Sequence, residues 1–372
     1  MGERLVRSGG SGGRSGLDIF GLGLAQLQSI LDNIAGDRVI SCAAAAGREL
    51  QGHRGYSAEK MIATLSWVTE SGRAGETPVF VKWFHRGGPH EARHYEWLSA
   101  CGAPIARMYG SLLTPDNREM LFLECLSHVD AMVPFDEFLL DSGQFLPFVS
   151  AAARFNAVRP PAEYVSSLPV WNCAEVLAGG HSVLDSLWAR ASGGHLGRRL
   201  ADLCAGHAGE VNCVHDAIEK VMGPIGGMET GLCHNDFWPD STCRHPAKGE
   251  SVVIDLESVG IAPRFRDIAR WLGAAMEGQR SCISPRDAAE FYLREYDRAG
   301  GPSLPVSQLL AEAPLLHFAG LVEMLWFSLA RAMDGRVDWT NNVEEGREVF
   351  REQLLRTTRT LLAYARRFVR EI

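Results

Sequence analysis

The chain has 372 residues, of which 46% are hydrophobic and 22% are charged, and its formal net charge at pH 7 is -8. This length allows two lobes, each with its own apolar core, and the composition excludes a disordered polymer. The acidic balance argues against nucleic acid as the main partner, because phosphate backbones select basic surfaces.

Cysteine usage and the terminal sequence bear on location. The nine cysteines are odd in number and scattered, which is a poor pattern for a disulfide framework, so we expect reduced thiols and a cytoplasmic protein. Residues 1–17 are rich in Gly, Ser and Arg and lack the apolar stretch of a secretory signal, so they should form a flexible tail. The longest apolar region, 315–330, is shorter than the roughly 20 residues of a membrane span, and no membrane segment is predicted.

Residues 18–127 predict a first lobe that is built around a sheet. Apolar residues recur at helical spacing over 24–34 and predict a short amphipathic helix. Beyond it, short apolar runs separated by turns predict strands, and residues 90–99 have the composition of a helix. The predicted strands cover residues 61–68, 79–84 and 120–123. An antiparallel sheet with one helix is therefore expected here.

Residues 128–372 predict a second, mainly helical lobe. Its amphipathic segments lie near residues 148–157, 181–191, 211–221, 286–299, 309–332 and 342–369. One compact region of loops and short strands, 231–257, interrupts these helices and contains the residues suited to chemistry.

Two acidic residues in that region stand at positions that suggest phosphate chemistry. Asp236 lies in the polar loop 233–241, and Asp255 ends an apolar strand that begins at Ser251. A carboxylate that emerges from a buried strand is costly unless a cation or hydrogen-bond donors receive it, which favours a metal. Phosphoryl transfer uses one acid to orient the attacking hydroxyl and accept its proton, and another to hold the magnesium that bridges the phosphates.

The combined pattern resembles a known superfamily. His234-x-Asp236, an aromatic-Pro turn and then Asp255-x-Glu257 resemble the aminoglycoside phosphotransferases and choline kinases, distant relatives of protein kinases. Recognisable landmarks cover residues 39–275, and the rest matches only in being helical. The resemblance implies a bilobal α+β, protein-kinase-like fold with an N-terminal antiparallel sheet plus helix. It also implies ATP and Mg²⁺ as cofactors, and transfer of the γ-phosphoryl group to a hydroxyl of a small molecule.

The resemblance assigns roles to individual residues. Asp236 would be the catalytic acid and Asp255 a magnesium ligand. Lys82, in the strand 79–84, stands where the family has the lysine that contacts the nucleotide phosphates. Glu91 stands where the family places the acid that pairs with this lysine, and Glu96 is the rival candidate.

Two further segments resemble nucleotide-binding parts of the family. The strand 121–126 looks like the hinge between lobes, where the backbone at Glu124 and Leu126 would bind adenine. Ser57 lies in a turn with glycines, 52–58, where the phosphate-covering turn should be.

The metal-binding pattern departs from the family at one position. The family normally has Asn five residues after the catalytic Asp, as a magnesium contact, and this chain has Ser241. A serine hydroxyl can ligate magnesium, but it is shorter than asparagine and offers no carbonyl, so a water or Asp240 would complete the shell. Our hypothesis is an active enzyme that depends more on magnesium than its relatives. Further along, the resemblance gives Asp267 the structural role of bracing loop 233–241.

Other interpretations stay open from the sequence alone. Ser241 also fits a pseudokinase that binds nucleotide without efficient transfer, and the acceptor could be a Ser or Thr of a peptide in a natural-product pathway. Antibiotic, choline-like and sugar hydroxyls are further options, and the oligomeric state is undefined. A zinc site at Cys233, His234, Cys243 and His245 is disfavoured because the spacing lacks a Cys-x-x-Cys pair.

Overall fold

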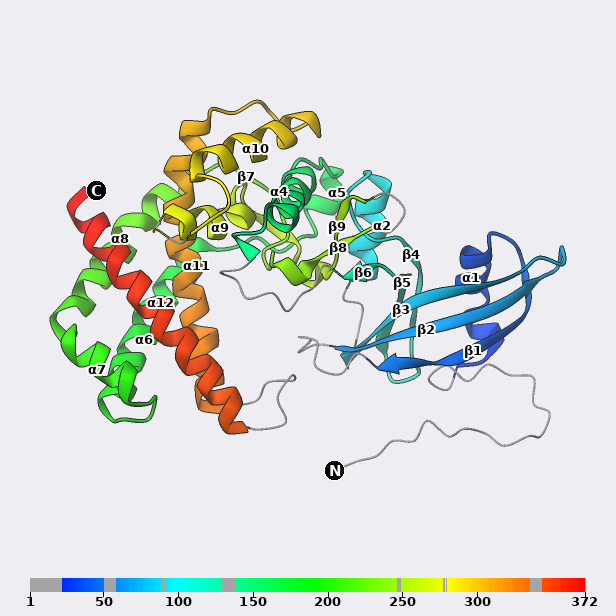
Figure 1. The fold of residues 1–372 in the computed structure, drawn as a ribbon, viewed down its shortest axis with the longest axis horizontal. Coiled ribbons are helices and arrows are strands. Elements are labelled where there is room, and N and C mark those ends of the chain that lie inside the picture. The colour runs from blue at the N-terminus through cyan, green and yellow to red at the C-terminus, as the bar shows by residue number, and fades with distance from the viewer. Residues whose placement is uncertain are drawn as a thin grey trace. The chain divides into compact units, whose positions relative to one another are not determined.

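A computed structural model describes residues 22–49, 58–87, 91–128, 138–245, 249–276, 278, 280–334 and 343–371. The chain divides into two compact units (Figure 1). The N-terminal unit consists of Met1–Ser99 and Ile105–Ser127, and the C-terminal unit of Ala100–Pro104 and His128–Ile372. The expected flexible tail, 1–17, and the expected phosphate-covering turn, 52–57, lie outside the described residues.

The N-terminal unit is a five-stranded antiparallel sheet with two helices. Its strand order is β1-β2-β3-β5-β4, so β3 is the central strand. The elements are α1 (Leu24–Ala35), β1 (Val39–Glu49), β2 (Ala58–Thr69), β3 (Ala74–Gly87), α2 (Ala92–Ala100), β4 (Met108–Leu113) and β5 (Arg118–Glu124). The predicted sheet with a helix is confirmed, and β1 and β4 are strands that the sequence did not predict.

The core of this unit lies between α1 and one face of the sheet. Leu27, Ile30 and Leu31 of α1 pack in one cluster with Val79 and Val81 of β3. Side chains alternate between the two faces of a strand, so Phe80 and Lys82 lie on the face opposite to Val79 and Val81. The apolar packing of α1 therefore directs Lys82 away from this core.

The C-terminal unit is mainly helical. Its longer helices are α4 (Ser142–Asn156), α6 (Cys173–Ser192), α7 (Arg198–Gly206), α8 (Val211–Gly226), α9 (Arg266–Met276), α10 (Pro285–Arg298), α11 (Val306–Asp334) and α12 (Val343–Glu371). The short elements are α5 (Ala162–Val165), η1 (Ala208–Glu210), η2 (Pro239–Ser241), η3 (Leu256–Ser258) and the strands β6 (Ser127–His128), β7 (Thr230–Cys233), β8 (Thr242–Arg244), β9 (Ser251–Val253) and β10 (Gly260–Pro263). The predicted interruption at 231–257 is confirmed, because β7 to β9 and η3 lie there and β7 pairs with β10.

Among the described helices, α11 is long and apolar enough to cross a membrane by length and composition. More than half of its most apolar window, 56%, is buried inside the protein. The helix packs against α12, α9 and α6, and Figure 1 shows α11 and α12 running side by side. It is therefore a core helix, and its apolar character reflects burial among neighbours on several sides.

Candidate functional site

A buried ion pair joins Lys82 and Glu91 in the N-terminal unit. The two residues are only 2% and 0% exposed. Lys82 extends from β3, and its Nζ lies 4.7 Å from the centre of the Phe84 ring. Two charges in a dry environment are tolerated only when they compensate each other, so Glu91 both neutralises and positions the ammonium group. The contact predicted between these residues is present, whereas Glu96 is exposed on α2.

The start of α2 is anchored by a residue that the sequence did not indicate. Glu119 of β5 is buried, and its Oε2 accepts hydrogen bonds from the backbone N–H of Glu91, at 2.7 Å, and of Ala92, at 3.4 Å. A carboxylate suits this place because the first N–H groups of a helix lack partners within the helix. Glu119 thereby fixes the backbone from which Glu91 reaches Lys82.

The predicted adenine-binding residues lie at the end of β5. The backbone N–H of Glu124 donates to the carbonyl of Arg107 at 2.8 Å, and Leu126 is buried. Their contact with adenine stays a prediction. The remaining residue of the predicted nucleotide site, Ser57, lies outside the described residues.

In the C-terminal unit, Asp267 holds loop 233–241 by its backbone. Its Oδ2 accepts from the backbone N–H of His234 at 2.7 Å, and its Oδ1 from the N–H of Asn235 at 2.9 Å. The Nδ2 of Asn156 donates to the same Oδ2 at 2.8 Å and to the carbonyl of Leu232 at 3.0 Å. Buried carboxylates that accept several N–H bonds hold a backbone segment firmly. The predicted bracing role of Asp267 is confirmed.

Asp236 follows directly on this braced segment and is exposed. Its Oδ1 accepts a hydrogen bond from the indole Nε1 of Trp238 at 2.7 Å. The preceding residue, Asn235, has a left-handed backbone with φ of 66°. Its side chain secures that conformation, because Nδ2 donates to the carbonyl of Ser258 at 3.1 Å. One oxygen of the Asp236 carboxylate is thus fixed, while among the described residues the other accepts no hydrogen bond.

Ser241 closes the same loop. Its Oγ donates to the carbonyl of Asp236 at 2.8 Å and accepts from the backbone N–H of Trp238 at 3.2 Å. The carbonyl of Ser241 accepts from the N–H of Ile254 at 2.9 Å, which ties the loop to the segment that carries Asp255. The hydroxyl therefore has a structural task in the loop, and its contact with magnesium stays a prediction.

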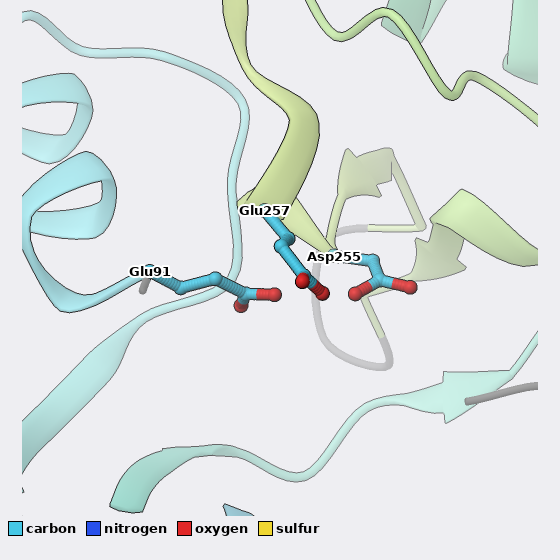
Figure 2. A group of neighbouring side chains, drawn as sticks. All are labelled: Glu91, Asp255 and Glu257. Atoms are coloured by element: carbon cyan, nitrogen blue, oxygen red, sulfur yellow. The ribbon is translucent and has the colours of Figure 1, made fainter. Parts of the chain in front are cut away.

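Asp255 and Glu257 present two carboxylates from one turn. Asp255 has a left-handed backbone, with φ of 65° and ψ of 56°, at the start of η3. Carboxylate oxygens of the two residues lie within 4.8 Å of each other, and Figure 2 shows the side chains emerging side by side; Glu91, also drawn there, belongs to the N-terminal unit. Paired carboxylates are the oxygen ligands that magnesium and other hard cations prefer.

His234 and Cys233 are buried at the start of loop 233–241. The Nε2 of His234 lies 2.9 Å from the carbonyl of Ile254, which fits an N–H donated to that oxygen. Burial raises the pKa of the Cys233 thiol well above its ordinary value. Within the described part of the chain, no metal-binding group of side chains contains Cys233, His234, Cys243 or His245. The predicted supporting role of His234 agrees with this geometry.

Comparison with known families identifies the chain. The model of the phosphotransferase enzyme family, APH, matches residues 66–302. The chain belongs to this family. The resemblance seen between His234 and Glu257 is thereby confirmed, and the chain is a phosphotransferase. The match includes Lys82, Asp236 and Asp255.

The kinase-like fold is confirmed by the first of three similar solved structures. A candidate aminoglycoside phosphotransferase from Ralstonia eutropha JMP134 is 14% identical, with a TM-score of 0.50 over 87% of this chain and 93% of that one. An ethanolamine kinase from Plasmodium vivax is 13% identical, with a TM-score of 0.48 over 80% of each chain. A choline kinase from Streptococcus pneumoniae is also 13% identical, with a TM-score of 0.46 over 92% of this chain and 99% of that one. Among curated proteins, none gives a significant match.

The sequence assigned no role to two residues that lie close to Asp236. Trp238 holds Asp236 through its indole N–H, and Arg270 of α9 stacks on the Trp238 ring with its Cζ 4.0 Å from the ring centre. The two positions are separated by β8, β9 and β10, so nothing in the local sequence links them. An aromatic residue two positions after Asp236 was visible in the sequence, but its contact with the carboxylate depends on the loop conformation.

Proposed function

We propose that this phosphotransferase moves the γ-phosphoryl group of ATP to a hydroxyl group of a small molecule. The observation that carries the proposal is the braced loop, in which Asp236 keeps one carboxylate oxygen fixed by Trp238 and the other without a hydrogen bond among the described residues. A general base works best when its position is fixed and one oxygen is available to the proton that it accepts. Asp236 meets both conditions.

The chemical step follows from these groups. The acceptor hydroxyl donates a hydrogen bond to Oδ2 of Asp236, which orients the oxygen toward the γ-phosphorus. A bond forms between the acceptor oxygen and the γ-phosphorus, while the bond from that phosphorus to the bridging oxygen of ADP breaks. The hydroxyl proton passes to Asp236. Lys82, neutralised by Glu91 and fixed by it, holds the phosphate oxygens.

The cation site fits Mg²⁺ by its chemistry. Asp255 and Glu257 provide closely spaced carboxylate oxygens, and Ser241 provides a hydroxyl that already serves its own loop. Asp255 would be the principal ligand. When bound, magnesium supplies neutralisation of the charge on the phosphate oxygens.

The decisive experiment is the Asp236→Asn variant. Turnover with ATP should fall at least about 100-fold, because general-base catalysis contributes that much or more, while nucleotide affinity stays close to that of the parent protein. Production of ADP over a panel of hydroxylated small molecules measures turnover, and calorimetry measures nucleotide binding. Asp185→Asn is the matched control, since Asp185 is an exposed acid on α6. Equal turnover in the two variants would refute the assignment.

The role of Ser241 is tested by Ser241→Asn. An amide carbonyl is a better magnesium ligand than a hydroxyl at this position, so the magnesium concentration needed for half-maximal transfer should fall. The variant also removes the two loop hydrogen bonds of Ser241, and Ser241→Ala controls for that loss. A magnesium requirement that is the same in the parent protein and in Ser241→Asn would contradict the hypothesis.

A further inference from the structure

A pocket lies beside Asp236 in the C-terminal unit. It is lined by Asn235 and Phe237 of loop 233–241, by Arg266, Asp267 and Arg270 of α9, and by His317 of α11. Its wall therefore includes both neighbours of Asp236 in the sequence. A group bound in this pocket would lie next to the carboxylate that receives the acceptor hydroxyl.

Arg270 is the arginine of this wall that forms no ion pair with a described residue. Its guanidinium stacks on the Trp238 indole, yet within the described residues it forms no ion pair and donates no hydrogen bond. Burial lowers the pKa of this guanidinium, and the nearby charge of Asp236 opposes the shift. The Arg270 side chain is half-buried, and its N–H donors, which have no partner among the described residues, are available to a ligand in the pocket.

The neighbouring arginine shows the contrast. Arg266, one helical turn away, forms an ion pair with Glu323 and donates from Nε to Oδ1 of Asn235 at 3.1 Å. It also stacks on the ring of Trp171, at 4.1 Å. Its charge and its donors are thus used within the protein, while those of Arg270 are not.

The other titratable groups of the pocket are committed or neutral. Asp267 accepts from the backbone of loop 233–241. His317 is buried, and burial together with the charge of Arg270 lowers its pKa to about 3, so its imidazole is neutral at pH 7. Its Nδ1 lies 3.3 Å from the hydroxyl of Tyr364. Glu323 neutralises Arg266, which leaves the cation of Arg270 and the exposed anion of Asp236.

We propose that Arg270 binds an anionic group, a carboxylate or a phosphate, on the acceptor molecule, an assignment that rests on the proposed function. A guanidinium has five N–H donors in a planar fork, which matches the two oxygens of a carboxylate or phosphate. Arg270 and Asp236 contact the same indole, one on its face and the other at its N–H. The acceptor therefore carries its hydroxyl and its anion a few bonds apart, as in a small hydroxy acid or a phosphorylated alcohol. An ammonium group in this pocket would be repelled by Arg270.

A series built on one three-carbon skeleton tests the charge preference. Glycerate and glycerol 3-phosphate are the anionic members, glycerol and glyceramide the neutral ones, and 3-amino-1,2-propanediol the cationic one. Binding is measured by ligand-observed NMR with the full chain, in the presence of ADP and Mg²⁺, and transfer by ADP release from ATP. We expect saturable binding in the millimolar range or tighter for the anions, and weaker binding for the others. The two anions distinguish a carboxylate from a phosphate.

Substitutions assign the preference to Arg270. Arg270→Met should weaken binding of the preferred anion about tenfold to a hundredfold, the range expected for hydrogen bonds to a charged group. Arg270→Lys retains the charge but loses the planar fork of donors. Its affinity for the anion should therefore lie between those of the parent protein and of Arg270→Met. Arg294→Met is the matched control: Arg294 is exposed on α10 and its guanidinium lies 5.2 Å from the ring of Phe291. Thermal unfolding of each variant shows that the fold is retained.

The outcomes separate this inference from the proposed function. Preferred binding of the neutral or cationic members, no saturable binding of either anion, or unchanged anion binding in Arg270→Met would overturn the inference, while transfer that needs Asp236 would still support the function. Conversely, anion binding that needs Arg270 but is accompanied by no transfer would uphold the site and refute the function.

Discussion

In the N-terminal unit the buried charge of Lys82 is held by a second charge, that of Glu91, whereas in the C-terminal unit loop 233–241 is held by hydrogen bonds from its own backbone to Asp267. The first arrangement positions a flexible side chain inside an apolar sheet and requires that both partners stay ionised. The second positions a backbone segment, so that the side chain of Asp236 stays exposed and available. A buried ammonium group and an exposed carboxylate thus need different kinds of support.

Removing one partner of the buried pair should give the largest effect. Lys82→Met leaves the Glu91 carboxylate in an apolar environment, and we expect a loss of about 3–5 kcal/mol in the free energy of opening of the N-terminal unit. Hydrogen exchange at the amides of β3 measures it. Adding Glu91→Met should recover much of the loss, because no charge is then left unpaired. Lys60→Met, at the position registered opposite Lys82 on β2, should stay within about 0.5 kcal/mol.

Weakening the brace of the C-terminal unit should have a smaller effect. In Asp267→Asn an amide replaces the carboxylate, so the backbone N–H groups of His234 and Asn235 lose a charged acceptor. We expect the free energy of local opening at those two amides to fall by about 2–3 kcal/mol, which is measured as faster hydrogen exchange there. Turnover should also be lower. Asp202→Asn, an exposed acid on α7, serves as control. Unchanged exchange at the two amides would show that Asp267 is not what holds the loop.

Each unit contains a histidine whose lowered pKa should make that unit less stable in acid. The pKa of His317 in the folded protein is lowered to about 3 by burial and by Arg270, whereas in the unfolded chain it is near 6.5. As the pH falls, the unfolded chain therefore binds a proton at this histidine before the folded protein does. Stability is thus fully present above about pH 6.5 and falls as the pH decreases toward 3. From pH 7 to pH 5 the C-terminal unit should lose about 2 kcal/mol through this group.

The test of this linkage is specific to one unit. His317→Gln should flatten the pH dependence of hydrogen exchange in α11, which carries this residue, without changing that of the N-terminal unit. His94→Gln should do the reverse, because burial, aided by Arg93, lowers the pKa of His94 on α2 to about 4. A pH dependence in α11 that persists unchanged in His317→Gln would assign the effect to other groups.

The smallest effect concerns the left-handed backbone of Asp255. Glycine adopts this conformation without a side-chain penalty, so Asp255→Gly should stabilise the C-terminal unit by up to about 1 kcal/mol while transfer is lost. Chemical denaturation monitored by the fluorescence of the tryptophans measures the first, and ADP production the second. A destabilisation greater than about 1 kcal/mol would mean that the carboxylate serves the fold as well as the chemistry.

The fold was predictable where the local pattern and the tertiary environment agree. The alternating runs of β2, β3 and β5 and the amphipathic helix α1 were found from the sequence. β1 was not, because its segment contains four consecutive alanines, 43–46, and neither alternates nor favours a strand by itself. Its pairing with β2 decides the conformation. The length of α6, which begins at Cys173, was likewise underestimated.

The site divides in the same way. Lys82, Glu91, Asp236 and Asp255 could be named from the resemblance of their motifs to those of the family, which keeps these residue types in the same order. Glu119, Trp238 and Arg270 could not be found, because each acts through a contact with a residue distant in the sequence or through a particular loop conformation.

The sequence by itself therefore determined the family, the kinase-like fold and the identity of the acids and the lysine expected to act on phosphate. Only the tertiary structure decided how those groups are supported, and it placed Arg270 near Asp236 without an ion pair or a hydrogen bond to any described residue. The physical reason is that motif residues are specified by their own chemistry, whereas the charge balance of a buried pocket depends on every side chain that the fold brings together there.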